Sequence, residues 1–111
     1  SRRQQAQASE TGEAVLTRLV LSPTAFQDID RLTDFLLESD PVAAGDTTPL
    51  LIGGLRVLQQ HPLIGRPVER GYRELVISRG DTGYVALYKF DIENDLVVVL
   101  TIRHQREAGY L

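Results

Sequence analysis

A short polar segment near the end of the chain carries the residues best suited to chemistry. Arg103, His104 and Arg106 follow a dense apolar run, and Tyr110 lies six residues past the histidine. Histidine can act as a general base or acid because its ordinary pKa lies near neutrality. Arginine can clamp phosphate oxygens and stabilise negative charge. His104 is therefore the candidate base or acid, and no other residue readily replaces it.

Each of these residues also has a structural interpretation. His104 could be a strand-end histidine bonded to a nearby backbone group. Arg103 and Arg106 could pair with surface acids. Tyr110 could stack on a base or donate a proton, or it could anchor the C-terminus against the sheet. The residue types alone leave both interpretations open.

More arginines precede this segment, and all basic residues except Lys89 are arginine. Arg66 and Arg70 fall in a loop, 63–72, that is rich in glycine and proline. Arginine is the better residue for bidentate phosphate contact. These side chains can converge on the edge that carries His104.

Arg73 and Arg79 lie at the two ends of a predicted strand, and the facing of that strand is ambiguous. If Leu75 and Ile77 point into the core, both arginines project from the rims of the core-facing side. If Val76 points inward instead, both arginines lie on the open face. The strand is apolar on both sides, so both orientations remain open.

An aromatic stripe follows in the next apolar run, where Tyr84, Ala86, Tyr88 and Phe90 share one face. Such a stripe is usually core or a cross-strand pair. An exposed stripe could stack on nucleic-acid bases. We expect a core stripe, with Tyr88 as the one candidate for an exposed exception.

Strands are predicted around these residues in the second half of the chain. The apolar runs 84–90 and 96–102 flank the polar corner 91–95, which predicts a β-hairpin. The second run is dense enough in Val, Leu and Ile to be buried on both faces. The strand 73–79 and a turn at 80–83 precede the hairpin.

A strand and two helices are predicted in the first half. Residues 16–21 form a short strand, and Ser22-Pro23 then starts a helix that ends at Asp40-Pro41. A second helix is expected from about Thr48 to Gln60, with a loose or kinked turn upstream. Gly54 would allow close contact with the first helix, and the buried stripe would be Leu51, Leu55 and Leu58.

The predicted fold is α+β. An N-terminal strand and two helices on one face of a small sheet are completed by a three-strand antiparallel C-terminal meander. Residues 1–14 lack large apolar side chains and are expected to be a disordered lead-in, whereas 15–111 form a single domain. The other face of the sheet is expected to be partly open, and function is expected there.

Composition excludes several classes of protein. A net charge of −3 argues against nonspecific nucleic-acid binding by the whole surface. The chain has no cysteine, no apolar run of membrane-spanning length and no signal-peptide pattern, so we expect a cytoplasmic protein without membrane contact. No metal, nucleotide or flavin motif occurs, and we expect neither a cofactor nor a metal site.

Several phrases, in this order and spacing, resemble the RelE/ParE family of toxins from bacterial type II toxin–antitoxin modules. They are LVLSPTAFQDIDRLTDFL, HPLIGRPVERGYRELVI, YVALYKF and LVVVLTIRHQREAGY, and they cover roughly Leu16 to Tyr110. The resemblance implies a compact toxin fold and a cognate antitoxin that wraps or caps the toxin and silences it.

The resemblance leaves the activity open. One branch looks like metal-independent ribonucleases that cut messenger RNA on the ribosome, and another looks like poisons of DNA gyrase without catalytic activity. A third hypothesis is an inactive, peptide-binding relative. The ribonuclease-like members carry lysines around the second helix, which this chain lacks, whereas the histidine–arginine–tyrosine ending favours a ribonuclease.

We favour the ribonuclease hypothesis over the gyrase hypothesis. The predicted catalytic residues are His104, Arg103, Arg79, Arg73 and Tyr110. The residues predicted to bind RNA or another target are Arg66, Arg70, Arg106 and Tyr88.

Overall fold

The structure is a computed structural model, and it describes residues 16–79 and 82–105. The predicted lead-in, 1–14, lies outside the described residues. The elements in chain order are β1 (Arg18–Leu21), α1 (Pro23–Ser39), α2 (Pro41–Leu55), α3 (Val57–Gln60), β2 (Arg66–Pro67), a 3-10 turn (Glu69–Gly71), β3 (Arg73–Arg79), β4 (Thr82–Asp91) and β5 (Leu96–His104).

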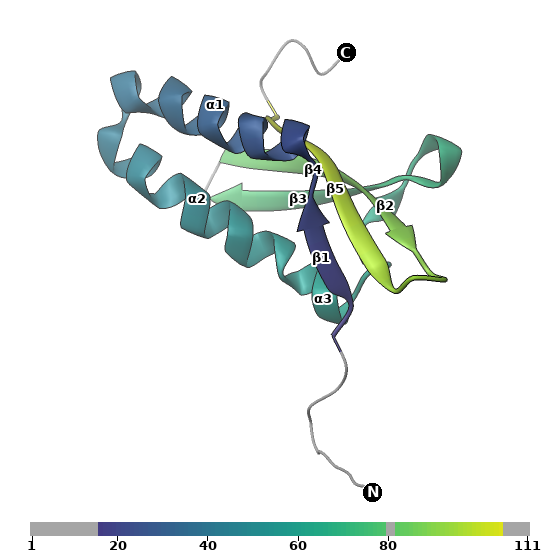
Figure 1. The fold of residues 1–111 in the computed structure, drawn as a ribbon. Coiled ribbons are helices and arrows are strands. Elements are labelled where there is room, and N and C mark those ends of the chain that lie inside the picture. Colours follow the sequence, from purple (N-terminus) through teal and green to yellow (C-terminus); the bar gives the residue numbers. More distant parts are fainter. Residues whose placement is uncertain (1–15, 80–81, 106–111) are drawn as a thin grey trace, which may run out of the picture.

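These strands form one mixed sheet in the order β1-β5-β4-β3-β2. Strand β1 runs parallel to β5, and the other neighbours are antiparallel, which confirms the predicted meander of β3, β4 and β5 (Figure 1). Helices α1 and α2 lie side by side against one face of the sheet, as predicted (Figure 1). Strand β2 was missed because its two residues lie in a segment rich in Gly and Pro that predicts a loop.

Helix α1 begins and ends where the sequence predicts. The side chain of Ser22 accepts a hydrogen bond from the backbone N–H of Ala25 at 3.0 Å, and Pro23 occupies the first turn. Ala25, Ile29 and Leu32 are buried, so the predicted apolar face of the helix packs on the sheet.

Helix α2 begins seven residues before its predicted start at Thr48, so that start is wrong. Asp40 ends α1 and also caps α2, because its carboxylate accepts from the N–H of Ala43 at 3.1 Å. Pro49 lies inside the helix, where it removes only the hydrogen bond to Gly45. A turn at Arg56 separates α2 from α3.

The buried stripe of the helical region is confirmed, but the predicted role of Gly54 is wrong. A Cβ atom at Gly54 would lie 2.9 Å from the side chain of Ile77, so this glycine lets α2 approach β3 rather than α1. The core between helices and sheet contains Leu32, Leu51, Leu55, Leu58, Tyr84, Tyr88, Val97, Val99 and Ile102.

Candidate functional site

Strand β5 carries a β-bulge that decides which way its last residues face. Leu87 pairs with Thr101, whereas Tyr88 pairs with Val99, so Leu100 is an extra residue in β5. Val99 on one side of the bulge and Ile102 beyond it both point to the helices and are buried. The alternation of side chains therefore shifts by one residue at Leu100.

As a result, Arg103 and His104 point to opposite faces of the sheet. His104 follows Ile102 on the helix-covered side and is only 9% exposed. Its ring meets the ring of Tyr84 edge-on, with centroids 5.3 Å apart and planes at 89°. The ring of His104 therefore packs at the end of the core.

Arg103 lies on the open face and belongs to an ion-paired cluster with Glu74 and Arg66. One oxygen of the Glu74 carboxylate lies 2.6 Å from Arg66 Nη2, and the other lies 3.3 Å from Arg103 Nη2. The side chains of Arg103 and Glu74 are 17% and 12% exposed, and that of Arg66 is 72% exposed. We call these three residues the Arg–Glu–Arg bridge.

Glu74, the centre of this bridge, was not among the residues predicted from the sequence. Glu74 pairs with Arg66 across β2 and β3, which places both residues on one face. The available signal was an acid in an arginine-rich stretch, on the opposite side of its strand from Leu75 and Ile77.

Arg73 lies on the core-facing side of β3, because Ile77 is buried toward the helices and Val76 is exposed. Its guanidinium donates hydrogen bonds to the carbonyl oxygens of Leu63 at 3.1 Å and Gly65 at 2.8 Å. Arg73 therefore fixes the loop before β2 by direct contact with its backbone.

Tyr88 is fully buried, so its prediction as an exposed stacking platform is wrong, and the core interpretation of the aromatic stripe holds. Its hydroxyl donates to the carbonyl oxygen of Pro62 at 2.8 Å and accepts from the N–H of Gly65 at 2.9 Å. Burial raises the pKa of the Tyr88 hydroxyl, while the bond from Gly65 and the charge of Arg73 oppose that rise.

The remaining predicted residues are less closely defined. Arg79 pairs with Thr82 at the end of β3. Arg70 is exposed in the 3-10 turn, with a positive φ of 64° beside Gly71. Arg106 and Tyr110 lie outside the described residues. Within residues 16–79 and 82–105, no group of three or more His, Asp or Glu could hold a metal ion.

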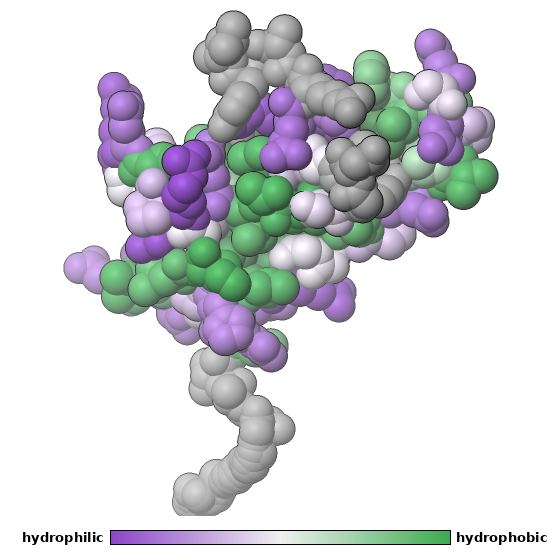
Figure 2. Space-filling model, turned by 180° about the vertical axis from the view of Figure 1, so that it is seen from behind, coloured by the Kyte–Doolittle hydropathy of each residue, from purple (hydrophilic) through white to green (hydrophobic). Residues whose placement is uncertain are grey.

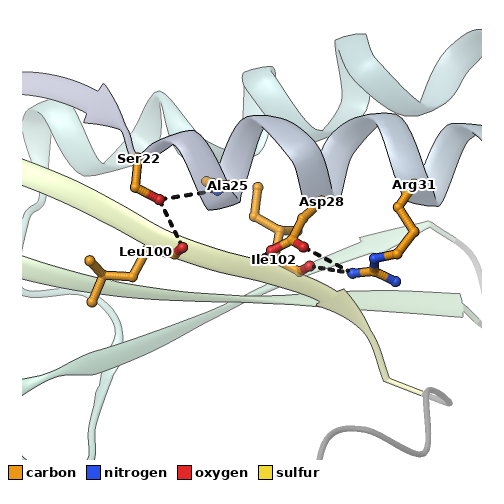
Figure 3. A network of polar contacts seen from close by, with 6 residues as sticks. All are labelled: Ser22, Ala25, Asp28, Arg31, Leu100 and Ile102. Atoms are coloured by element: carbon orange, nitrogen blue, oxygen red, sulfur yellow. Dashed lines mark hydrogen bonds and ion pairs between the residues drawn. The ribbon is translucent and has the colours of Figure 1, made fainter.

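Helix α1 contributes a polar network that the sequence did not predict. Strand β1 ends at Leu21, beside Val99, and beyond that point no strand of the described residues covers this edge of β5. Figure 3 shows side chains of α1 in place of the missing strand. Ser22 donates to the carbonyl oxygen of Leu100 at 2.9 Å.

Further along the same edge, both backbone groups of Ile102 are bonded to α1 (Figure 3). Asp28 accepts from the Ile102 N–H at 2.8 Å, and Arg31 donates to the Ile102 carbonyl oxygen at 3.2 Å. Arg31 also pairs with Asp28 at 3.3 Å. These contacts fix the end of β5 that carries Arg103 and His104.

A second surface lies at the opposite edge of the sheet. There, β2 pairs with β3 only at Arg73 and Glu74. Within the described chain, no strand therefore covers the outer edge of β3, the edge away from β4, from Leu75 to Arg79. An open groove runs along this edge. Figure 2 shows apolar side chains, in green, gathered in patches on the molecule as seen from behind. We call it the edge groove; its lining includes Pro49, Leu50, Gly53, Val57, Ile64 and Val76.

Comparison with known proteins places the fold in a family. A family model described as the ParE toxin of the type II toxin–antitoxin system parDE matches residues 19–109. Toxin RelE3 of Caulobacter vibrioides is 37% identical over 87 residues, which are 78% of this chain and 92% of that toxin. Toxin RelE1 of the same organism is 38% identical over 71 residues, or 64% of this chain and 76% of that toxin.

Two solved structures share the fold. A chain of the chromosomal ParDE system from P. aeruginosa has a TM-score of 0.67 at 23% identity, covering 79% of this chain and 95% of that one. A chain of the toxin–antitoxin complex RelBE2 from Mycobacterium tuberculosis has a TM-score of 0.59 at 25% identity, covering 87% and 100%.

The described helices include none that is long and apolar enough to cross a membrane. The elements and their order agree with those predicted from the sequence pattern, apart from the earlier start of α2, the separate α3 and the added β2. Since the family model spans most of the chain and Toxin RelE3 is matched along nearly all of its length, this chain belongs to the RelE/ParE family of toxins from bacterial type II toxin–antitoxin systems.

Proposed function

We propose that this toxin arrests growth by binding its target rather than by cleaving RNA, and that the target is DNA gyrase. The proposal reverses the preference drawn from the sequence alone. It rests on the ParE branch of the family resemblance and on one observation. The side chains of His104 and Arg103 point to opposite faces of the sheet.

Metal-independent cleavage of RNA needs a base and a phosphate-binding cation that touch the same substrate. His104 lies among core side chains on the helix side, and Arg103 is bonded to Glu74 on the open face. A substrate bound to the open face would meet Arg103 but would be separated from His104 by the sheet itself. This separation favours binding over catalysis.

Two more of the predicted site residues, one catalytic and one target-binding, also have structural roles. Arg73 bonds two backbone carbonyls of the loop before β2, and Tyr88 bonds the same loop from the core. A residue bound in this way holds a loop rather than a reacting phosphate. The described part of the chain therefore supports a rigid binding protein.

A metal-independent messenger-RNA ribonuclease is the second candidate. It is favoured by the names of the relatives, Toxin RelE3 and Toxin RelE1, at 37% and 38% identity. In this alternative, His104 is the base, and removing its ring abolishes toxicity.

A cognate antitoxin is the expected partner, as in the ParDE system and the RelBE2 complex to which this chain is similar. The edge groove fits an extended apolar segment of such a partner. The uncovered edge of β3 offers backbone groups to an added strand, and the groove beside it takes apolar side chains.

The test compares wild type, His104→Ala and His61→Ala under inducible expression, with growth, messenger-RNA integrity and plasmid supercoiling measured together. His61 is an exposed histidine and provides the matched control. We expect all three forms to arrest growth, with intact transcripts and altered supercoiling. Binding of each form to the antitoxin verifies that it is folded.

The opposite pattern would overturn the proposal. Specific message cleavage by wild type and by His61→Ala, lost together with toxicity in a folded His104→Ala protein, would establish the ribonuclease alternative. Unaffected growth at verified expression of the wild type would instead favour an inactive relative.

A further inference from the structure

The open face of the sheet differs in charge from the molecule as a whole. The chain carries a net charge of −3. Side-chain alternation along the described strands places more cations than carboxylates on the open face. The cations are Arg18, Arg66, Lys89 and Arg103, and the carboxylates are Glu74 and Asp91. This face is therefore suited to an acidic partner.

Within this face, the Arg–Glu–Arg bridge has a buried end and an exposed end. Arg103 and Glu74 are largely covered, whereas Arg66 is 72% exposed. The Glu74 carboxylate uses a different oxygen for each arginine, so the bond to Arg103 does not compete with the bond to Arg66. Glu74, itself held by Arg103, thus restrains the exposed guanidinium of Arg66.

This arrangement prepares Arg66 for binding. A free arginine side chain loses considerable rotamer freedom when a partner immobilises it. Glu74 accepts from one Nη atom of Arg66 at 2.6 Å, and the exposure of the side chain leaves the rest of its donor fork facing solvent. A carboxylate of a partner could therefore bind Arg66 at a smaller cost in side-chain entropy than it would a free arginine.

The surroundings of the bridge match a protein partner better than a nucleic acid. Val76 is 54% exposed on the same face of β3 as Glu74, and Leu87, which pairs with Glu74, is half-buried. Arginine combined with apolar side chains is typical of protein–protein interfaces. Nucleic-acid surfaces rely on many phosphate-contacting cations, and this face has few.

We propose that the open face is the surface that contacts the toxin's protein target, with Arg66 as the anchor that binds an acidic side chain of that target. Glu74 is a positioning residue for Arg66, and Arg103 secures Glu74 from the covered side. This inference rests on the proposed function, in which toxicity arises from binding a protein.

The experiment measures the affinity of purified toxin for purified DNA gyrase, and the toxin dose that arrests growth, for four variants. They are Arg66→Ala, Glu74→Gln, the double variant and Arg56→Ala. Arg56 is an exposed arginine at the end of α2, away from the sheet, and serves as the control. Antitoxin binding and Tm verify that each variant is folded.

We expect Arg66→Ala to weaken gyrase binding roughly tenfold or more, as removal of an interface anchor does, while Arg56→Ala changes little. Glu74→Gln should weaken binding less. In the Arg66→Ala background, Glu74→Gln should add almost nothing, because a positioning residue acts only through the residue it positions.

Full growth arrest by Arg66→Ala at the wild-type dose would overturn the inference, whatever the target is. Equal effects of Glu74→Gln with and without Arg66 would remove the positioning role and leave Glu74 a purely structural residue. If the wild type binds no gyrase but Arg66→Ala still needs a much higher dose, the proposed target is wrong and the contact surface stands.

Discussion

The hydroxyl of Tyr88 shows how a single polar atom can anchor a loop from inside the core. It bonds the carbonyl oxygen of Pro62 and the N–H of Gly65, and a Cβ at Gly65 would lie 2.6 Å from its ring. Tyr88→Phe leaves both backbone groups without this partner. We expect a loss of about 1–3 kcal/mol in the free energy of unfolding, measured by urea denaturation.

The same residue predicts a pH dependence. Burial raises the pKa of the Tyr88 hydroxyl, so the folded protein keeps its proton at a pH where the unfolded chain has begun to lose it. The contribution of the protonated Tyr88 hydroxyl to the free energy of unfolding is therefore complete below the ordinary tyrosine pKa of about 10. It is lost as pH rises through the higher pKa of the folded protein.

The stability of wild type should therefore fall more steeply above pH ~10 than that of Tyr88→Phe. Tyr84→Phe provides the comparison, because that ring is also buried in the core. If the free energy of unfolding fell equally with pH for wild type and Tyr88→Phe, the Tyr88 hydroxyl would not be the source of the pH dependence.

Side chains at the start of α1 and along it bond the backbone of β5 where no described strand pairs with it. Asp28→Ala removes the acceptor of the Ile102 N–H, and the side chain it removes is only 15% exposed. We expect a destabilisation of about 1–3 kcal/mol and faster hydrogen exchange at Ile102.

Asp30→Ala on the exposed side of the same helix is the matched control and should change the free energy of unfolding little. Similar losses for both variants would mean that helix charge, rather than the bond to Ile102, explains the effect. Unchanged exchange at Ile102 in Asp28→Ala would also contradict the assignment.

Most element boundaries could be predicted because local chemistry determines them. Ser22-Pro23 caps and starts α1, and the polar corner 91–95 turns the hairpin in the structure as in the prediction. Asp40-Pro41 was interpreted as a stop only, although the same pair also starts α2. Gly45 and Pro49 weaken the helix signal in the sequence of this segment, whereas tertiary packing stabilises the helix in the fold.

The facing of the site residues could not be predicted for a different reason. Residues 96–102 are apolar apart from Thr101, so the pattern gives no sign of an extra residue at Leu100. Without the bulge, strict alternation from Val97 would put Arg103 on the helix side and His104 on the open face. One inserted residue thus changes the candidate chemistry of the site.

Apart from Val76, the two proposed binding surfaces of the molecule are formed by different residues. The Arg–Glu–Arg bridge lies on the open face, whereas the edge groove is bounded by the helices, the loop before β2 and β3. Val76 lines the groove and also projects from the open face, so the two surfaces adjoin. An antitoxin in the groove would then lie next to the target surface, which explains how it could block the target.

This arrangement predicts that neutralisation and toxicity can be separated. Val57→Asp and Ile64→Asp each put a charge into the apolar lining of the groove at an exposed position, where little folding energy depends on the side chain. Burying that charge against a partner without a counter-ion is costly, so antitoxin binding should weaken at least tenfold. Cells that express both proteins should then stop growing, whereas wild-type toxin is neutralised.

Arg66→Ala should show the converse, with antitoxin binding retained and toxicity reduced, because its side chain lies on the other surface. Affinity measured with purified antitoxin and growth under co-expression together distinguish the two variant classes. Loss of toxicity in Val57→Asp and Ile64→Asp, with the proteins folded, would place the target in the groove as well. The antitoxin would then act by direct competition for one site rather than from a neighbouring one.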